Sequence, residues 1–390
     1  MSFQNSSNQN DPPSKRLLVI SFSDLASDPR VNRQIRLLTG RFRLTAAGFA
    51  DPEIPGVEFV GVQRTPRSVG GKWLAAAMLK LRLFERFYWS LCSVRDALGA
   101  LQSSDFDLIL ANDLLTLPLA CSLNSRQGVV FDAHEYSPRE LEENWKWRFF
   151  YREFMHYLCE KYIPRTAAML TVCDGIAEEY GRCYGAKPVV VHNAPYFAAL
   201  APQPVSSDGI RLVHHGGAVA SRNIEVMIDM MNSLDERFSL DLFLVPSDPQ
   251  YLEKLHKLVA KHPRIRILPP VPMQQLPQVV NRYDVGVYIL KPNNFNNAHA
   301  LPNKFFEFVQ GRVAIAIGPS PEMAMLVRKY DCGIVADDFA PQSLARELRK
   351  LTPERIVQYK MNVHRAAFDL CYENTSRALL NTINGLLGDG

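Results

Sequence analysis

The stretch NAHALPNKFFEFVQG, residues 297–311, lies between two apolar runs, DVGVYIL (284–290) and VAIAIG (313–318). Its apolar side chains recur at the spacing of an amphipathic helix, and Asn303 is a suitable N-cap residue. Each flanking run has the length of a buried strand. The three segments therefore predict a strand–helix–strand unit of a parallel sheet.

The same alternation of apolar runs and helical patterns extends along the chain. In the first half, the predicted strands are 16–23, 43–49, 56–62, 106–113, 128–135, 167–173 and 187–193. In the second half, they are 210–217, 240–246, 264–270, 284–290, 313–318 and 332–336. This order predicts an α/β protein with two Rossmann-like, doubly wound domains that face a central cleft. Ligands are expected at the carboxyl ends of the strands.

The chain of 390 residues is long enough for two hydrophobic cores. APYFAALAPQPVSSDG interrupts the alternation and is predicted to be a linker. The predicted parts are a disordered tail (1–15), an N-terminal domain (16–195), the linker (196–209), a C-terminal domain (210–370) and a closing helix that packs back on the N-terminal domain (371–390).

Composition and motifs argue against several function classes. The net charge of +4 gives no global field toward nucleic acid, and the seven cysteines form no zinc or CxxC pattern. The polar N-terminus and the lack of a long apolar run predict a cytoplasmic chain without a membrane span. The motifs GxGxxG, GxxxxGK[ST], GxSxG and HExxH are absent from the sequence, which argues against dehydrogenases, P-loop NTPases, α/β-hydrolases and zinc proteases.

A nucleotide-linked substrate fits two doubly wound domains without these motifs, because a helix N-terminus and basic side chains can bind a diphosphate. On this interpretation, Asn303 and Lys304 open a helix toward the phosphates, and Glu307 accepts hydrogen bonds from ribose hydroxyls. The alternative is a capped amphipathic helix with Lys304 and Glu307 in solvent.

The stretch HHGGAVASRN (214–223) is a second candidate for phosphate binding. Gly216 and Gly217 permit a close approach of the backbone to a ligand, and Arg222 lies near the start of a predicted helix. An ordinary turn explains this stretch equally well.

Three side chains with acid–base chemistry end an apolar strand of the first half: Asp132, His134 and Glu135. A histidine at such a position is more often structural, but the neighbouring carboxylates favour a functional role. Asn112 and Asp113 end the preceding strand, where they join this group or cap the next helix.

The segment 64–95 carries seven Lys or Arg residues, a single Glu and several aromatic residues, and it overlaps a helical region predicted over 72–101. The stretch NWKWRFFYR (144–152) is similar. A basic, aromatic helix is typical of contact with an anionic membrane surface. The alternative is a buried helix with aromatic core residues and solvated charges.

The pieces VFDAHEYSPRE, LTVCDGIAEEYGRCYGAKPVVVHNAP and LPNKFFEFVQGRVAIAIG, in this order, resemble the family 4 glycosyltransferases of the GT-B fold. The resemblance extends over nearly the whole chain. It implies a nucleotide-sugar bound mainly by the C-terminal domain, an acceptor bound mainly by the N-terminal domain, retention of anomeric configuration, and no metal. His134 matches a strand-end histidine that lies near the reacting sugar in the family.

The resemblance also assigns residues and shows two departures. Glu307 matches the second glutamate of the family pair, which binds ribose, whereas the first glutamate falls at His299. Of the two basic residues that hold the diphosphate, the second falls at Arg222 and the first at Ala218, so Lys304 or Lys291 would replace the missing charge. The candidates for the nucleotide-sugar site are Gly216, Gly217, Arg222, Val271, Lys291, His299, Asn303, Lys304 and Glu307. Those for catalysis are Asp113, Asp132, His134 and Glu135, with Asn193 at the hinge.

The sequence thus predicts a retaining glycosyltransferase of bacterial surface polysaccharide or glycolipid synthesis. Its expected partners are a nucleotide-sugar donor, a glycan or lipid-linked acceptor and the inner face of the cytoplasmic membrane, without nucleic acid, cofactor or metal. The two departures motivate a non-catalytic, nucleotide-binding or scaffold protein as an alternative. A third reading is a sugar-nucleotide epimerase or hydrolase.

Overall fold

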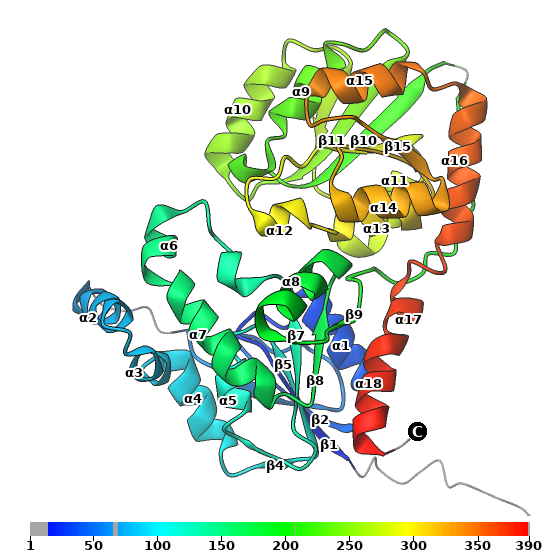
Figure 1. Ribbon diagram of the computed structural model, residues 1–390. Helices are drawn as coiled ribbons and strands as arrows, with labels where there is room; N and C mark the ends of the chain where they lie inside the picture. The colour runs from blue at the N-terminus through cyan, green and yellow to red at the C-terminus, as the bar shows by residue number, and fades with distance from the viewer. Residues whose placement is uncertain (1–14, 65–68, 207, 389–390) are drawn as a thin grey trace, which may run out of the picture. The chain divides into compact units, whose positions relative to one another are not determined.

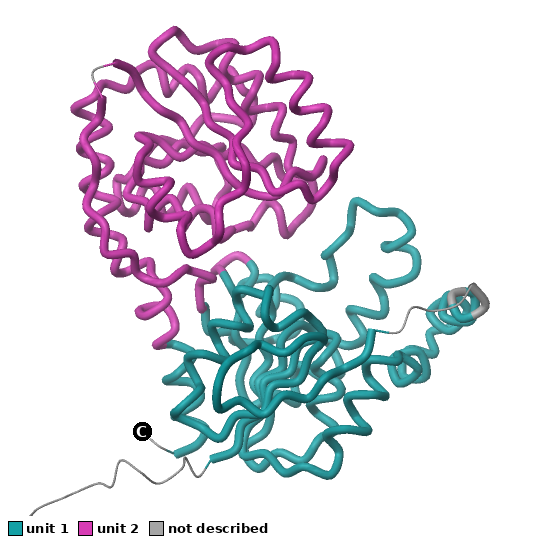
Figure 2. Tube along the Cα trace, turned by 180° about the vertical axis from the view of Figure 1, so that it is seen from behind, with its two compact units in different colours: residues 1–172, 176–190, 378–390 teal, residues 173–175, 191–377 magenta. Residues whose placement is uncertain are grey.

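The computed structural model describes residues 15–64, 69–206 and 208–388. Within these ranges the chain forms two compact units (Figure 2). Unit 1 contains the residues up to 172, residues 176–190 and those from 378 onward, and unit 2 contains residues 173–175 and 191–377. The part of the predicted tail up to residue 14 lies outside the described residues, as do residues 65–68 of the basic, aromatic segment.

Unit 1 is built on a seven-stranded parallel sheet with the order β3-β2-β1-β5-β7-β8-β9 (Figure 1). Its strands are β1 Arg16–Ile20, β2 Arg43–Gly48, β3 Val57–Gly61, β5 Leu108–Asn112, β7 Val129–Ala133, β8 Ala168–Thr171 and β9 Val189–Val190. A separate parallel pair consists of β4 Asp105–Phe106 and β6 Asn124–Ser125. Every residue of β5 and β7 is buried, which explains their continuous apolar sequence.

The helices of unit 1 connect these strands. They are α1 Pro29–Leu38, α2 Val69–Lys80, α3 Phe84–Trp89, α4 Cys92–Leu101, α5 Leu117–Ala120, α6 Trp145–Phe150, α7 Arg152–Tyr162, α8 Asp174–Tyr184 and the last helix, α18 Arg377–Leu387, with the 3₁₀ turns η1 Ser137–Arg139 and η2 Ile163–Arg165. Helix α1 begins where it does because the Asp28 side chain accepts hydrogen bonds from two first-turn N–H groups.

The helical region predicted over 72–101 is confirmed, and it consists of three separate helices, α2, α3 and α4. Arg82, between α2 and α3, has a φ of 55°, which a continuing helix does not allow. The buried-helix alternative holds for the aromatic side chains of α3, since Phe84, Phe87 and Tyr88 are in the core. It fails for α2, where Trp73 is 76% exposed.

Unit 2 is built on a six-stranded parallel sheet with the order β12-β11-β10-β13-β14-β15 (Figure 1). Its strands are β10 Ile210–Gly217, β11 Phe238–Val245, β12 Ile265–Leu268, β13 Val285–Tyr288, β14 Ala314–Ile317 and β15 Gly333–Val335. Its helices are α9 Glu225–Met231, α10 Pro249–Val259, α11 Leu276–Val280, α12 Phe295–Ala298, α13 Asn303–Gln310, α14 Pro321–Tyr330, α15 Pro341–Arg349, α16 Pro353–Ala366 and α17 Tyr372–Thr375, with the 3₁₀ turns η3 Ala220–Arg222 and η4 Met273–Gln275. Every predicted strand is therefore found; the bounds of β10 are those predicted, and the ends of the other strands are shifted.

Two local predictions in unit 2 need correction. Asn303 is the first residue of α13 and does not cap it, because Pro302 occupies the N-cap position and no side chain accepts from the first turn. Arg222 lies in the 3₁₀ turn η3 and not at the start of α9, since Asn223 follows it with a φ of 47°. The solvent-exposed alternative for Lys304 and Glu307 is also wrong, because each is only 8% exposed.

Candidate functional site

Unit 2 contains a cavity of about 420 Å³ at the carboxyl ends of β10 and β11 and in the segment after β12. Its walls are His215, Gly216, Gly217, Arg222, Phe243, Val245, Pro270, Val271, Met273, Leu276, Pro302, Asn303, Lys304 and Glu307. This is the edge of a doubly wound sheet where ligands bind. The cavity brings together seven of the nine residues predicted for the nucleotide-sugar site.

Two positive charges converge on the ring of Tyr288 beside this cavity. The ammonium of Lys304 lies 4.0 Å from the centre of the ring, and Arg222 donates a hydrogen bond of 2.9 Å to its hydroxyl. Among the residues that the structure describes, neither cation forms an ion pair with a carboxylate. Burial, together with the nearby Arg222, lowers the pKa of Lys304 well below its usual value. A bound anion would therefore offset the cost of burying these two positive charges without a carboxylate partner.

The neutral side chain of His214 positions Lys304. Its Nδ1 lies 3.0 Å from the carbonyl oxygen of Val287, which only accepts, so Nδ1 carries the hydrogen. Burial and the charge of Lys304 lower the pKa of His214 well below its usual value, so the ring is neutral. The free Nε2 lone pair can then accept from the Lys304 ammonium at 3.1 Å.

Two backbone features allow a ligand to approach these cations. The first-turn N–H groups of α13 receive no side-chain cap, and Asn303 and Lys304 of that turn line the cavity. Gly216 has a φ of 137°, and a Cβ atom there would lie 3.3 Å from the Lys304 ammonium. A side chain at position 216 would therefore be strained and would crowd the cation.

The remaining walls divide into an acidic part and an apolar part. Glu307 is buried, and its Oε2 lies 3.6 Å from Nε2 of His215. Phe243, Val271 and Leu276 form part of an apolar wall that bears no charge. Cations, a carboxylate and an apolar surface in one cavity match the chemistry of a diphosphate, a ribose and a base, respectively.

The structure does not bring Lys291 or His299 to the cavity wall. Lys291 is exposed after β13. His299 ends α12, and its Nδ1 lies 3.1 Å from Oε1 of the buried Glu322 in α14. Ala218 is fully buried, and Asn193 follows β9 near the boundary between the units.

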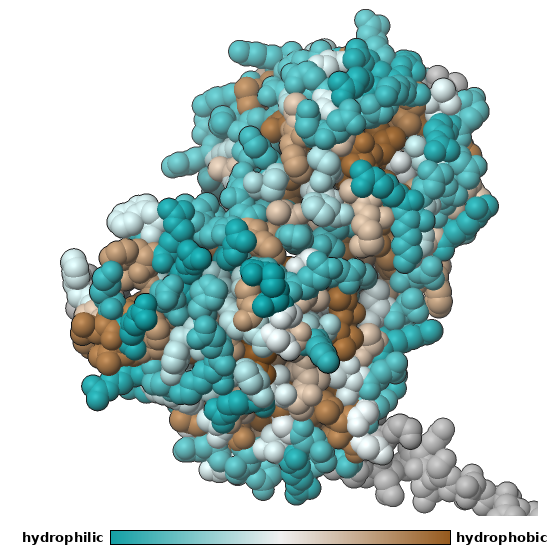
Figure 3. Space-filling view, in the orientation of Figure 1, coloured by the Kyte–Doolittle hydropathy of each residue, from teal (hydrophilic) through white to brown (hydrophobic). Residues whose placement is uncertain are grey.

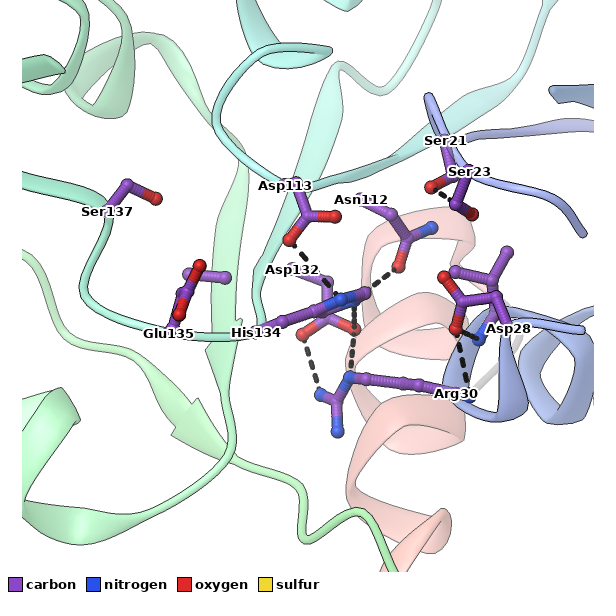
Figure 4. A network of polar contacts seen from close by, with 12 residues as sticks. Ser21, Ser23, Asp28, Arg30, Asn112, Asp113, Asp132, His134, Glu135 and Ser137 are labelled. Carbon is purple, nitrogen blue, oxygen red and sulfur yellow. Dashed lines mark hydrogen bonds and ion pairs between the residues drawn. The ribbon is translucent and has the colours of Figure 1, made fainter. Parts of the chain in front are cut away.

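Unit 1 contains a polar cluster at the carboxyl ends of β5 and β7 (Figure 4). Nδ1 of His134 lies 3.2 Å from Oδ1 of Asp113, and its Nε2 lies 3.0 Å from Oδ1 of Asn112 and 3.6 Å from Oδ2 of Asp132. Burial by itself would lower the pKa of His134, but Asp113 and Asp132 more than offset this and raise it. The raised pKa favours the protonated imidazole, which donates hydrogen bonds to these carboxylates and is poorly suited to act as a base.

A buried ion pair fixes Asp132, one of the two carboxylates that face this histidine. Arg30 of α1 donates two hydrogen bonds to Asp132, at 2.8 and 2.6 Å, and Gln34 of the same helix donates a further one. Burial would raise the pKa of Asp132, but Arg30 and His134 hold it well below its usual range. Asp132 is thus a fixed anion that orients His134.

Asp113 and Glu135 line a second cavity, of about 190 Å³, together with Glu140. Asp113 has a φ of 65°, a left-handed conformation that aspartate tolerates better than most residues. Burial and the neighbouring Glu140 carboxylate raise the pKa of Glu135. This cavity can therefore offer a carboxylic acid and carboxylates to a polar ligand.

Sequence reasoning missed several residues that complete both sites. Arg30, Gln34 and Glu140 in unit 1 and His214, His215 and Tyr288 in unit 2 were not among the predicted site residues. His214 and His215 immediately precede Gly216 at the end of a predicted strand, and this position could have marked them as site residues. The role of Arg30 depends on a partner 102 residues away, which no local pattern reveals.

Comparison with known proteins extends over almost the whole chain. HepE of Anabaena, in complex with UDP-glucose, matches with a TM-score of 0.69 and 13% identity, covering 95% of this chain and 100% of HepE. Sucrose-phosphate synthase of Thermosynechococcus elongatus matches with a TM-score of 0.67 and 13% identity, covering 96% and 100%. The chain has the GT-B fold. A glycosyltransferase of Rickettsia africae has the same fold, with a TM-score of 0.62 and 10% identity, covering 96% and 99%.

No protein-family model and no curated protein sequence matches the chain. At identities of 10 to 13%, the likeness establishes the GT-B fold and leaves the activity to the site itself. The prediction of two parallel sheets, made from the alternation of strands and helices, is confirmed.

Proposed function

We propose that this chain is a retaining glycosyltransferase, of the hexosyltransferase type and similar to family 4, that uses a nucleotide-diphosphate sugar. The observation that carries the proposal is the pair Lys304 and Arg222, two cations without a carboxylate partner in the described chain, beside an uncapped helix N-terminus. HepE binds UDP and UDP-glucose on the same fold, which favours a uridine diphosphate sugar as the donor.

The reaction breaks the bond between the sugar's anomeric carbon and the diphosphate and forms a bond from that carbon to an acceptor hydroxyl oxygen. The leaving diphosphate takes the acceptor proton. Lys304, Arg222 and the N-terminus of α13 stabilise the negative charge that develops on the diphosphate. Because two side-chain cations perform this role, the proposed reaction requires no metal.

The cluster of unit 1 supplies the acceptor side of the proposal. His134, fixed by Asp113 and Asp132, donates a hydrogen bond near the reacting sugar, and Glu135 contacts the acceptor. The acceptor is a glycan or a lipid-linked glycan of a bacterial surface polysaccharide or glycolipid pathway.

A lipid-linked acceptor is supported by an exposed patch on unit 1, which we call the apolar patch. It consists of Trp73, Leu74, Leu81, Trp145 and Phe149. Figure 3 shows apolar side chains gathered over α2 and α3. Basic side chains border the patch, and one of them, Lys80, lies 3.8 Å from the ring centre of Phe149. This chemistry fits an anionic membrane surface, in the proposal the inner face of the cytoplasmic membrane. None of the helices in the described ranges is both long and apolar enough to span a bilayer.

The experiment that tests the proposal is a thermal-shift panel with UDP, GDP, dTDP, ADP and CMP on the parent and on Glu307→Ala. A ligand of the native state raises the melting temperature. We expect one diphosphate to stabilise the parent and the exposed control Lys291→Met, and to stabilise Glu307→Ala much less. The matching nucleotide-sugar should then give retained glycoside product with an acceptor and in the presence of EDTA.

Stabilisation by none of the five nucleotides would contradict the proposal. Binding of a nucleotide-sugar without turnover toward any acceptor would favour the non-catalytic alternative, which the departures at His299 and Ala218 support. Consumption of the donor with no acceptor present would point to a hydrolase or epimerase.

A further inference from the structure

The imidazole of His215 is a buried polar group in the wall of the unit 2 cavity, and the proposed diphosphate and base contacts leave it unused. It is 5% exposed and packs edge-on against Phe308, with ring centres 5.2 Å apart. In the described part of the chain, its Nε2 has no hydrogen-bond partner. A buried polar atom of this kind calls for a partner that the empty protein does not hold within hydrogen-bonding distance.

A possible hydrogen-bond acceptor is Oε2 of Glu307, which lies 3.6 Å from Nε2 of His215. This distance is too long for a hydrogen bond, but a shift of well under an ångström would form one. Burial and the charge of Lys304 lower the pKa of His215 well below its usual value, so the ring is neutral. Since a carboxylate only accepts, the Nε2 that faces it must carry the ring's single hydrogen.

The position of His215 and Glu307 suggests that they recognise the ribose of the nucleotide. A ribose presents two adjacent hydroxyl donors, and a carboxylate whose two oxygens are correctly oriented can accept from both. A 2′-deoxyribose has only one of these donors. It would leave one oxygen of a buried carboxylate unpaired, which is costly because the bound ligand would cover that oxygen.

We propose that His215 is a positioning residue that orients Glu307, so that the carboxylate reads both ribose hydroxyls and the site selects ribonucleoside diphosphates over 2′-deoxyribonucleoside diphosphates. The inference deepens the proposed function and rests on it. It places dTDP-sugars, which carry a 2′-deoxyribose, outside the donor class of this protein.

The test is calorimetric titration of UDP and 2′-deoxy-UDP into the parent, His215→Phe and His215→Asn. If another base is preferred in the thermal-shift panel, its ribo and deoxy diphosphates replace these two. We expect the parent to bind the ribonucleotide at least about thirtyfold more tightly than the deoxynucleotide. His215→Phe keeps a ring against Phe308 but has no ring nitrogen, and its preference should fall to about threefold or less.

The conservative variant separates orientation from packing. His215→Asn retains an N–H donor for Glu307 and should recover part of the ribose preference. A merely structural role for His215 would weaken both nucleotides by the same factor and leave their ratio unchanged, which would overturn the inference. Equal binding of UDP and 2′-deoxy-UDP by the parent would overturn it as well.

Failure of the proposed function gives a different result. In that case the parent binds no nucleoside diphosphate, ribo or deoxy, and the inference falls together with the function. A parent that binds ribonucleotides and deoxynucleotides alike keeps the proposed function and removes only the role of His215.

Discussion

The two polar clusters of this protein treat charge in opposite ways. In unit 1, Asp132 is bound by Arg30 and Gln34, and His134 lies between Asp113 and Asp132. In unit 2, two cations share an aromatic ring without a carboxylate partner in the described chain. A network of paired charges fixes its members in the empty protein, whereas unpaired cations lower the cost of binding an anion. We therefore propose that the first cluster is held in place before any ligand binds, whereas the second, which we call the receptor cluster, binds an anion.

The largest expected effect follows from breaking the paired network. Arg30→Met leaves the buried Asp132 carboxylate without its main cation, and such a loss typically costs about 3–5 kcal/mol of unfolding free energy. Urea denaturation should show this cost in the transition of unit 1. The matched control Arg36→Met removes an exposed arginine of the same helix and should change stability by less than about 0.5 kcal/mol. Equal effects of the two variants would show that the Arg30–Asp132 pair contributes no more to stability than an exposed arginine does.

The receptor cluster should respond in the opposite sense. Lys304→Met removes a buried cation whose charge is disfavoured in the empty protein, so the melting temperature without ligand should stay the same or rise. Affinity for the nucleoside diphosphate, measured by calorimetry, should fall about fiftyfold because a charge-assisted hydrogen bond is lost. Lys291→Met is the control outside the cavity wall and should bind normally. A variant that melts earlier yet binds as before would refute this assignment.

The pH dependence of stability sharpens the comparison. The folded-state pKa of His134 is raised above the unfolded value of about 6.5. Its contribution is therefore fully present below that unfolded pKa and is lost as the pH rises through the folded pKa. Thermal melts from pH 6 to 9 should show a loss of stability in the parent and a smaller loss in His134→Gln. The exposed control His256→Gln should behave as the parent does; an unchanged profile in His134→Gln would remove the histidine from the network.

The smallest effect concerns the aromatic ring beneath the two cations. Tyr288→Phe removes the hydroxyl that accepts from Arg222 but keeps the ring under Lys304. Affinity for the diphosphate should fall only about threefold to tenfold, because one neutral hydrogen bond orients the guanidinium. Tyr283→Phe, which loses a hydrogen bond to Asp241 elsewhere in unit 2, should leave the affinity unchanged. A loss as large as that of Lys304→Met would mean that Tyr288 contacts the ligand itself.

The sheets and the donor cavity could be predicted from sequence because their signals are local. Buried parallel strands have continuous apolar runs, and the carboxyl ends of those strands locate ligands in advance. Lys304, Glu307 and Gly216 could be found in this way. The burial of Lys304 could not, because it depends on His214 and Tyr288 from other strands.

Features that depend on contacts between distant segments were missed. The break between α2 and α3 depends on Arg82 adopting a left-handed conformation, which cannot be predicted from an arginine in the sequence. The Arg30–Asp132 pair joins α1 to the end of β7. The exposed side of α2 and the buried side of α3 have similar composition, so only tertiary packing distinguishes them.

The path of the chain through the two units has a consequence for its synthesis. Unit 1 is interrupted after β9, and α18, which buries Leu379, Ile383 and Leu387, belongs to unit 1 although all of unit 2 precedes it. During synthesis, all of unit 2 is therefore made before unit 1 receives this helix. Until then the earlier part of unit 1 leaves uncovered the apolar surface that these three side chains later bury, so the incomplete chain exposes a sticky face that the finished protein does not.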